Sequence, residues 1–384
     1  MKYLVLLCDG MSDERQPSLN NKTVIEYAKT PNMDKLAKEG VCGFVCTVPE
    51  GFPPGSDICN LSVFGYDPRK YYTGRSPLEA VSMGINLGAD DMAFRCNLVS
   101  LSPDGAVMED FSAHHIDSKS AGIVIERLNK LFAGSNIEFY QGLSYRNLAV
   151  VRNMNINADT TPPHDISGRE IAEYIPKGKD GGFVCDIMKK AAQVFDNETG
   201  KANSVWFWGQ GKRPLMPLYK DLYGLNGAVI AAVDLIKGIG LCAGMELIEV
   251  PGVTGFIDTN FEGKASYAVD ALKNKDYVFI HVEAPDEAGH MGSLEHKIAA
   301  AEKIDSVMLP VITEGLRQFG DHRILMMPDH PTPVRIKTHA ASPVPAVICG
   351  TGIEPDANTA YSEFITPSFT IKDGYKIMEM FLKK

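Results

Sequence analysis

The stretch that decides the fold is Lys2–Gly10, which has the sequence KYLVLLCDG. After Lys2 its side chains are apolar up to Cys8, and the run then ends at an Asp-Gly pair. A continuous apolar run of this length is typical of a strand buried on both faces of a parallel sheet. We therefore expect Asp9 at the carboxyl end of that strand, where open α/β sheets bind their ligands.

The same rhythm of strand and helix continues along the chain. A helix is predicted from Thr30-Pro31 to Gly40, because Thr caps helices, Pro fits the first turn and Gly ends them. Further strands are predicted at 43–48, 246–250, 277–282, 323–327 and 345–349, and helices around 264–273, over 294–314 and from about 374. This alternation indicates an α/β fold with a mainly parallel sheet flanked by helices.

The middle of the chain has a different character. Strand-like segments at 93–101, 147–151 and 204–208 are separated by long polar loops. Glycines at 84–88 and 224–227 allow the chain to change direction. At 384 residues the chain is also long for one domain. We expect a discontinuous core over 1–88 and 226–384, interrupted by an inserted α/β domain over 89–225.

Composition restricts the partners and the compartment. A net charge of −10 and a pI near 5.4 argue against binding of nucleic acid or of an anionic membrane, so an anionic substrate would need locally placed cations. The first apolar run is too short for a signal-peptide core, and no run is long enough to cross a membrane. The eight cysteines include no C-x-x-C pair. A cytoplasmic location is expected.

Six side chains of metal-ligating types follow the predicted strands. One of them alone would more often be a turn or surface residue. Strand ends converge in a parallel sheet, however, so the whole set points to a metal site. Carboxylate and imidazole without thiolate suit Mn²⁺, Zn²⁺, Mg²⁺ or Co²⁺. Two members stand four apart in 283–290 (EAPDEAGH) and would share a helix face. The set is Asp9, Asp286, His290, Asp329, His330 and His339.

A Gly/Pro turn presents a candidate nucleophile, Ser56, in the segment 51–57 (GFPPGSD). In isolation this serine would be interpreted as the N-cap of a helix. A serine oxygen bound to a divalent ion loses its proton more easily and can accept a phosphoryl group. A second ion can stabilise the opposite side of an in-line displacement. The sequence thus predicts phosphoryl transfer at a two-metal site, with Ser56 as nucleophile and as a metal ligand.

Several segments in order along the chain have a specific resemblance. They are DG at 9–10, GSD at 55–57, LSVFGYDP at 61–68, APDEAGH at 284–290, PDH at 328–330 and His339. Together they resemble the cofactor-independent phosphoglycerate mutases, and most closely their archaeal-type branch within the alkaline phosphatase superfamily. The resemblance covers nearly the whole chain in order and length.

The resemblance implies an isomerase of glycolysis and gluconeogenesis that interconverts 3-phosphoglycerate and 2-phosphoglycerate without 2,3-bisphosphoglycerate. It implies an alkaline-phosphatase-like core with a cap, and two divalent ions, with Mn²⁺ first and Zn²⁺, Co²⁺ or Mg²⁺ as alternatives. Ser56 would carry the phosphoserine. One ion site would consist of Asp286, His290 and His339, and the other of Asp9, Ser56, Asp329 and His330.

One segment departs from the family. The better-known branch has Ser-Glu-Val-Gly-His after its nucleophile, whereas this chain has Ser56-Asp-Ile-Cys-Asn60. The role of that histidine is therefore absent or moved. In the inserted domain, 206–214 (WFWGQGKRP) resembles the cap segment that places an arginine on the substrate, and 114–115 and 162–169 resemble other cap segments. The substrate-binding candidates are Arg213, His115, Arg152, His164, Asp165 and Arg169.

The same core could serve other reactions on a small anionic phosphorylated substrate. Transfer to water would make it a metal-dependent phosphatase, and transfer to another acceptor a related phosphotransferase such as a homoserine kinase. A module that only binds metal or ligand would be expected to lack a ligand or the hydroxyl at position 56. Neither is missing, so the sequence favours an enzyme.

Overall fold

The computed structural model describes residues 1–383 and divides into two compact units. The core unit comprises Met1–Tyr72 and the chain from Leu215 onward, and the inserted unit is Thr73–Pro214. The sequence placed these boundaries later, at 88 and 225. Helix α5 (Arg75–Ser82) accounts for much of the first difference, because its Ala80 packs with Ala93 and Leu148 of the inserted sheet.

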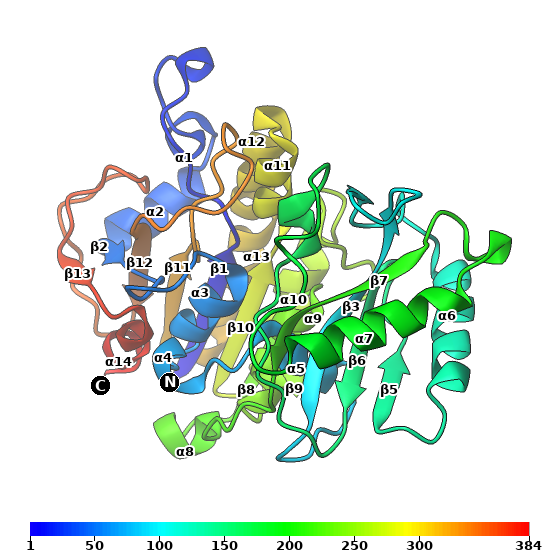
Figure 1. Cartoon of the computed structure of the whole chain (residues 1–384). Helices are drawn as coiled ribbons and strands as arrows, with labels where there is room; N and C mark the ends of the chain where they lie inside the picture. Colours follow the sequence, from blue (N-terminus) through cyan, green and yellow to red (C-terminus); the bar gives the residue numbers. More distant parts are fainter. Residues whose placement is uncertain (384) are drawn as a thin grey trace. The chain divides into compact units, whose positions relative to one another are not determined.

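The core unit is built on one eight-stranded sheet with the order β13-β2-β12-β11-β1-β10-β8-β9 (Figure 1). All neighbouring strands are parallel except that β12 runs antiparallel to both β11 and β2. The predicted α/β class with a mainly parallel sheet is therefore confirmed. The strands are β1 (Lys2–Cys8), β2 (Gly40–Val45), β8 (Gly227–Ile230), β9 (Glu246–Leu247), β10 (Tyr277–Val282), β11 (His322–Met327), β12 (Val344–Gly350) and β13 (Phe369–Ile371).

Strand β1 lies near the middle of this sheet, between β10 and β11. Its residues from Leu4 to Cys8 are fully buried, as the apolar run predicted. The parallel registers pair Cys8 with Val282 and Leu7 with Met327, so the three strands end at one edge. The residues that follow β1, β10 and β11 consequently meet there.

Helices cover both faces of the core sheet. On one face Leu4 and Leu6 pack with residues of α2 (Pro31–Glu39), α10 (Phe261–Ala271), α12 (Leu294–Lys303) and α13 (Leu309–Leu316). On the other, Phe64 stacks on Phe279 beside α3 (Ser56–Val63), and Phe381 of α14 (Ile377–Leu382) contacts Tyr3. The core unit also has α1 (Val24–Tyr27), α4 (Pro68–Tyr71), α8 (Tyr219–Tyr223), α9 (Asp234–Cys242) and α11 (Ala284–Met291).

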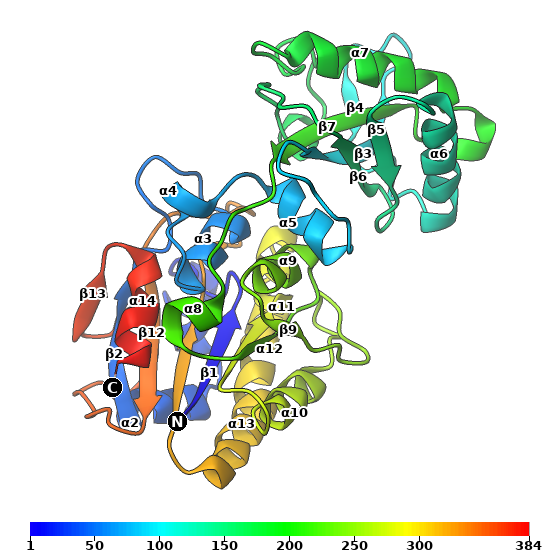
Figure 2. The ribbon, with the colours of Figure 1, turned by 90° about the horizontal axis from the view of Figure 1, so that it is seen from below.

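The inserted unit has a sheet of its own, with five strands in antiparallel pairs (Figure 2). Helices α6 (Ser118–Leu131) and α7 (Gly181–Ala191) pack in one hydrophobic cluster on it, and α5 packs in another. The strands are β3 (Met92–Leu101), β4 (Met108–Asp110), β5 (Ile137–Tyr140), β6 (Arg146–Val151) and β7 (Ser204–Gly211).

The two ends of the inserted unit lie side by side. Thr73 Oγ1 donates a hydrogen bond to the carbonyl of Lys212. Gly74 and Gly211 approach each other so closely that a Cβ on either would collide with the opposite backbone. The chain therefore enters and leaves this unit at one place. None of the helices in residues 1–383 is long and apolar enough to cross a membrane.

Candidate active site

The ends of β1 and β11 bring together three side chains that we call the Asp9 cluster: Asp9, Asp329 and His330. Asp9 is 4% exposed and the other two are fully buried. His330 Nε2 lies 3.5 Å from Asp9 Oδ1 and 3.4 Å from Asp329 Oδ2. One ligand atom from each residue lies within 4.8 Å of the other two, a spacing that could hold a single metal ion.

Helix α11 follows β10 directly and carries two members of a second group, the Asp286 cluster: Asp286, His290 and His339. His290 Nε2 lies 3.2 Å from Asp286 Oδ2 and 3.0 Å from His339 Nε2. His339 Nε2 is 3.6 Å from Asp286 Oδ1. The rings of His339 and His330 are 4.1 Å apart, so the two clusters are adjacent. The structure thus brings all six predicted ligand-type residues to one edge of the sheet.

Hydrogen bonds orient the histidine rings. The Nδ1 of His290 lies 3.1 Å from the carbonyl of Lys337, which requires a proton on that nitrogen. Thr332 Oγ1 donates to Asp286 Oδ1 and stands 3.2 Å from His330 Nδ1, which can donate to it. Both rings are therefore held with Nε2 toward the carboxylates, as metal-ligating histidines usually are.

Gly10 permits the close approach of the two clusters. Its φ is +60°, a left-handed conformation that glycine adopts without strain. Its backbone N–H donates to Asp329 Oδ1 at 3.1 Å. A Cβ at this position would lie 2.5 Å from Asp286 Oδ1 and from Thr332 Oγ1. The Asp-Gly pair at the end of β1 is thus required by the packing of the site.

Ser56 is the first residue of α3, and its Oγ lies 3.3 Å from His330 Nε2. The interpretation of this serine as an N-cap is wrong, because the N-cap is Gly55 and the Ser56 side chain makes no capping bond. One turn later Asn60 Nδ2 donates to the carbonyl of Ser56 and to Asp329 Oδ2. Asn60 therefore ties the serine to the Asp9 cluster at the position where the better-known branch has its histidine.

The electrostatics of this edge fit a divalent cation. Burial, reinforced by the charges of Asp329 and Asp286, raises the pKa of Asp9 well above its usual value. Asp9 Oδ1 is buried and has no hydrogen-bond partner among residues 1–383. Although burial opposes it, hydrogen bonding to His290 and His339 holds the pKa of Asp286 well below its usual range. Converging carboxylates and imidazoles with an unpartnered buried oxygen are the donor set that metal ions of the Mn²⁺ and Zn²⁺ type prefer.

Sequence reasoning missed the buried groups behind Asp9. His281 is fully buried within β10, 3.4 Å from Asp9 Oδ2. Glu283 lies on the other side of the His281 ring, 3.2 Å from its Nδ1, and Lys264 forms an ion pair with Glu283. A histidine inside an apolar strand was the available signal, but its partners come from other parts of the chain and cannot be identified from spacing.

Five of the substrate-binding candidates lie at accessible positions of the inserted unit. Arg169 and Arg213 are exposed. His164 is stacked edge-on against Trp208 at 5.3 Å and lies 3.6 Å from Asp165. His115 ends a stretch of three residues with positive φ (Ala113–His115) and contacts the ring of Tyr145. Such strained backbone is sometimes associated with function.

The guanidinium group of the sixth candidate, Arg152, is bonded to neighbouring groups of the inserted unit. Its Nη1 bonds to Asp91 and to the carbonyl of Asn86, and its Nη2 bonds to Glu138 and Tyr140. These contacts hold β5, β6 and the loop before β3 together. They fit a structural role rather than the substrate-binding role that the sequence predicted.

A cationic site that the sequence did not predict surrounds Arg95 of β3. Arg95 is 8% exposed, stacks on the Trp208 ring at 4.7 Å and lies 2.9 Å from Glu79. Glu79 also accepts a bond from Arg75. Burial, opposed by Glu79 and assisted by the charges of Arg75 and Arg146, lowers the pKa of Arg95 to about 10. Two guanidinium groups, of Arg75 and Arg95, thus pair with the one carboxylate of Glu79, an excess of positive charge suited to binding an additional anion.

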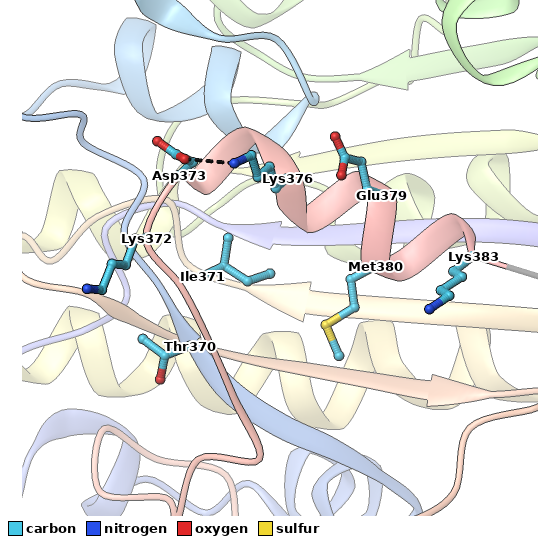
Figure 3. A pocket seen from close by; sticks show the side chains of 8 residues that line it. All are labelled: Thr370, Ile371, Lys372, Asp373, Lys376, Glu379, Met380 and Lys383. Carbon is cyan, nitrogen blue, oxygen red and sulfur yellow. Dashed lines mark hydrogen bonds and ion pairs between the residues drawn. The ribbon is translucent and has the colours of Figure 1, made fainter.

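The hollow in Figure 3 lies elsewhere, between the edge strand β13 and α14. Its lining includes Lys372, Lys376 and Lys383, but Lys376 is already paired with Asp373 at 2.9 Å. The lining residues contain no serine, histidine or cysteine. The candidate active site is therefore the edge formed by β1, β10 and β11, where the two clusters lie.

Comparison with known proteins gives consistent relatives. A family model described as 2,3-bisphosphoglycerate-independent phosphoglycerate mutase matches residues 37–200. A probable enzyme of that name from Geobacter sulfurreducens is 49% identical, with 100% of both chains covered. A solved Pyrococcus horikoshii protein matches with a TM-score of 0.84 at 28% identity, over 99% of this chain and 96% of that one. A cofactor-independent phosphoglycerate mutase from Thermoplasma acidophilum shares the fold, with a TM-score of 0.68 at 23% identity over 100% and 99% of the two chains.

Proposed function

Because the chain belongs to the 2,3-bisphosphoglycerate-independent phosphoglycerate mutase family, we propose that it interconverts 3-phosphoglycerate and 2-phosphoglycerate through a phosphoserine on Ser56. The observation that carries this proposal is the 3.3 Å approach of Ser56 Oγ to His330 Nε2, beside the carboxylates of Asp9 and Asp329. A serine used only to cap a helix would have no reason to face three ligand-type side chains.

Two divalent cations, Mn²⁺ first, are proposed for the two clusters. Asp9, Asp329 and His330 with Ser56 would hold one, and Asp286, His290 and His339 the other. Bound there, they would lower the pKa of the serine hydroxyl and neutralise the phosphoryl oxygens. The neighbouring charges support this, since an Asp9 carboxylate next to two others is stable as an anion only beside a cation.

The chain's own groups account for the transfer. Ser56 Oγ gives up its proton and attacks phosphorus. A new Oγ–P bond forms, the bond from phosphorus to the substrate oxygen breaks, and that oxygen takes up a proton in free glycerate. The N-terminus of α3 favours the resulting negative charge on Ser56. Asn60 keeps the first turn of α3 fixed against Asp329. In the second half the other hydroxyl of glycerate attacks the phosphoserine and regenerates Ser56.

Isomerisation also requires that glycerate stay bound between the two transfers. We assign recognition of its carboxylate to the inserted unit, with the Arg95 site as the strongest candidate. Arg95 is preorganised by Trp208 and Glu79, and Arg75 and Arg146 add positive charge beyond what Glu79 neutralises. Arg213, His115, His164, Asp165 and Arg169 remain further candidates.

The deciding experiment follows the products by phosphorus NMR. Metal-loaded protein is incubated with 3-phosphoglycerate, and 2-phosphoglycerate should form with little inorganic phosphate. Inorganic phosphate as the main product would contradict the proposal and make the protein a phosphatase. If neither product formed, the mutase assignment would fail, and homoserine with ATP would be the next substrate pair to test.

A further inference from the structure

His281 is an unusual residue for its position. It lies inside the apolar strand β10 and is fully buried, as are its neighbours Ile280 and Val282. Its ring is placed between two carboxylates, with Nε2 3.4 Å from Asp9 Oδ2 and Nδ1 3.2 Å from Glu283 Oε1. A buried imidazole destabilises a core unless its polar atoms interact with partners. The two carboxylates are the charged groups nearest this ring, but neither contact has hydrogen-bond geometry, and within residues 1–383 both ring nitrogens lack a hydrogen-bond partner.

Glu283 is held rigidly on the far side of the ring. Its Oε2 accepts a bond from Lys264 Nζ at 2.5 Å, and its Oε1 accepts one from the backbone N–H of Ala232 at 2.6 Å. Burial opposes ionisation, but the charge of Lys264 keeps the pKa of Glu283 well below its usual range. Lys264 is itself fully buried and also donates to the carbonyl of His281. Groups from α10 and from the loop after β8 thus fix this carboxylate, which directly follows β10.

The opposite end of the chain of contacts is Asp9. Its Oδ2 faces His281, while its Oδ1 faces His330 at 3.5 Å and has no hydrogen-bond partner among residues 1–383. We propose that Lys264, Glu283 and His281 form a buried chain that fixes the orientation of the Asp9 carboxylate, so that Oδ1 points at the cation of the Asp9 cluster. The inference rests on the proposed function, which supplies that cation.

The effect should be confined to one of the two ion sites. The Asp286 cluster is oriented by other groups, namely the carbonyl of Lys337 behind His290 and the hydroxyl of Thr332 on Asp286. Within residues 1–383, His281 forms no hydrogen bond or ion pair with either group. Removal of the His281 ring should therefore weaken binding of the ion at the Asp9 cluster and leave binding at the Asp286 cluster unchanged. If His281 had only a structural role, its replacement would weaken binding of both ions or of neither.

The test is a calorimetric titration of metal-free protein with Mn²⁺, with the electron paramagnetic resonance spectrum of the bound ions as a second readout. Wild-type protein should bind two ions. His281→Leu should bind one of them with wild-type affinity and the other about 10- to 100-fold more weakly, the usual effect of losing a group that orients a ligand. His281→Gln, whose amide can donate to the Asp9 carboxylate, should recover part of that loss.

Ile280→Val is the matched control, because it removes one methyl group from the same strand without touching Asp9. It should bind both ions like the wild type. Unchanged affinities in a folded His281→Leu protein would overturn the inference, and so would equal weakening of both sites. If His281→Leu does not fold, Glu283→Gln is titrated instead and should show the same selective loss. Wild-type protein that bound no Mn²⁺ would contradict the proposed function itself, a result distinct from a failure of this inference alone.

Discussion

Two serines of helix α3 show how surroundings decide what a side chain does. Ser56 faces His330 at the edge of the sheet, whereas Ser62 is fully buried and donates its hydroxyl proton to the carbonyl of Thr47. Both have the same chemistry in isolation. Of the two, only Ser56 faces ligand-type side chains, and there we propose that its oxygen meets an ion and a phosphoryl group.

Replacement of Ser56 by alanine should lower mutase activity by at least about a thousandfold, as loss of a nucleophile does in other enzymes. Acid-quenched protein incubated with phosphorus-32-labelled 3-phosphoglycerate should then carry no label. Ser62→Ala is the matched control and should lose about 1 kcal/mol of stability but keep the label. Retention of label by Ser56→Ala would show that another residue is the nucleophile.

Replacement of Arg95 by methionine should change the ratio of the products. If Arg95 holds glycerate, its loss lets glycerate escape, and water then takes the phosphoryl group from Ser56. The ratio of inorganic phosphate to 2-phosphoglycerate, measured by phosphorus NMR, should rise about tenfold or more, a loss typical of one charged hydrogen bond. Arg152→Met breaks ion pairs within the same unit and should reduce stability without moving this ratio.

The pH dependence of metal binding should reflect His290. Burial would lower the pKa of its ring, but the bond to Asp286 raises it to about 9. In metal-free protein this pair contributes stability that is complete below pH 6.5 and is lost as the pH rises through about 9. The imidazole must lose its proton to bind metal, so Mn²⁺ affinity should fall by up to about tenfold for each pH unit below 9. Calorimetry in buffers of different ionisation enthalpy should detect the released proton, and a pH-independent affinity would contradict the assignment.

The sequence could predict the six ligand-type residues because each follows a strand or lies within a short segment after one. It could not predict His281 or Arg95, which lie inside strands. The role of His281 depends on the register that sets β10 beside β1, and that of Arg95 on the packing of α5 against β3. Such pairings are determined by the tertiary structure and leave no local spacing to detect.

At the scale of elements, the position of the site follows from three strands that end together. The apolar runs predicted β1, β10 and β11 to within a residue or two. Other elements were less regular than predicted. The helix expected over 294–314 is interrupted by a π-helical turn at Ile304–Met308, and the strand expected over 246–250 pairs only at Glu246–Leu247. Neither irregularity touches the ends of the central strands.

The tight turn after β1 can be tested by replacing Gly10 with alanine. The new Cβ would collide with Asp286 and Thr332 and would also be strained at φ +60°. We expect Mn²⁺ affinity to fall by at least about tenfold and stability by about 1–3 kcal/mol. Gly84→Ala is the control, since Gly84 has φ +73° but open space around its Cα. Gly84→Ala should lower the melting temperature because of the backbone strain, without any change in Mn²⁺ affinity.

At the scale of the whole molecule, the net negative charge of the chain would repel an anionic substrate, so cationic side chains must be placed locally to bind it. The chain carries a net charge of −10, and the edge of the core sheet adds three buried carboxylates. Positive charge is gathered around Arg95 in the inserted unit. The composition alone argued against nucleic acid as a partner but could not locate these cations.

The inserted unit should fold by itself. It is one continuous segment with its own sheet and its own hydrophobic clusters. Residues 73–214 produced alone should give a cooperative thermal transition and dispersed amide resonances, and should not bind Mn²⁺ tightly. A disordered spectrum would mean that the unit depends on the core for its stability.

The close approach of the chain segments at Gly74 and Gly211 has a consequence for how such enzymes can diverge. The polypeptide enters and leaves the inserted unit at adjacent positions. The unit can therefore be exchanged as a whole in evolution, because only two neighbouring junctions need to be preserved. The machinery that moves phosphate would be inherited unchanged, while each new inserted unit could select a new acceptor.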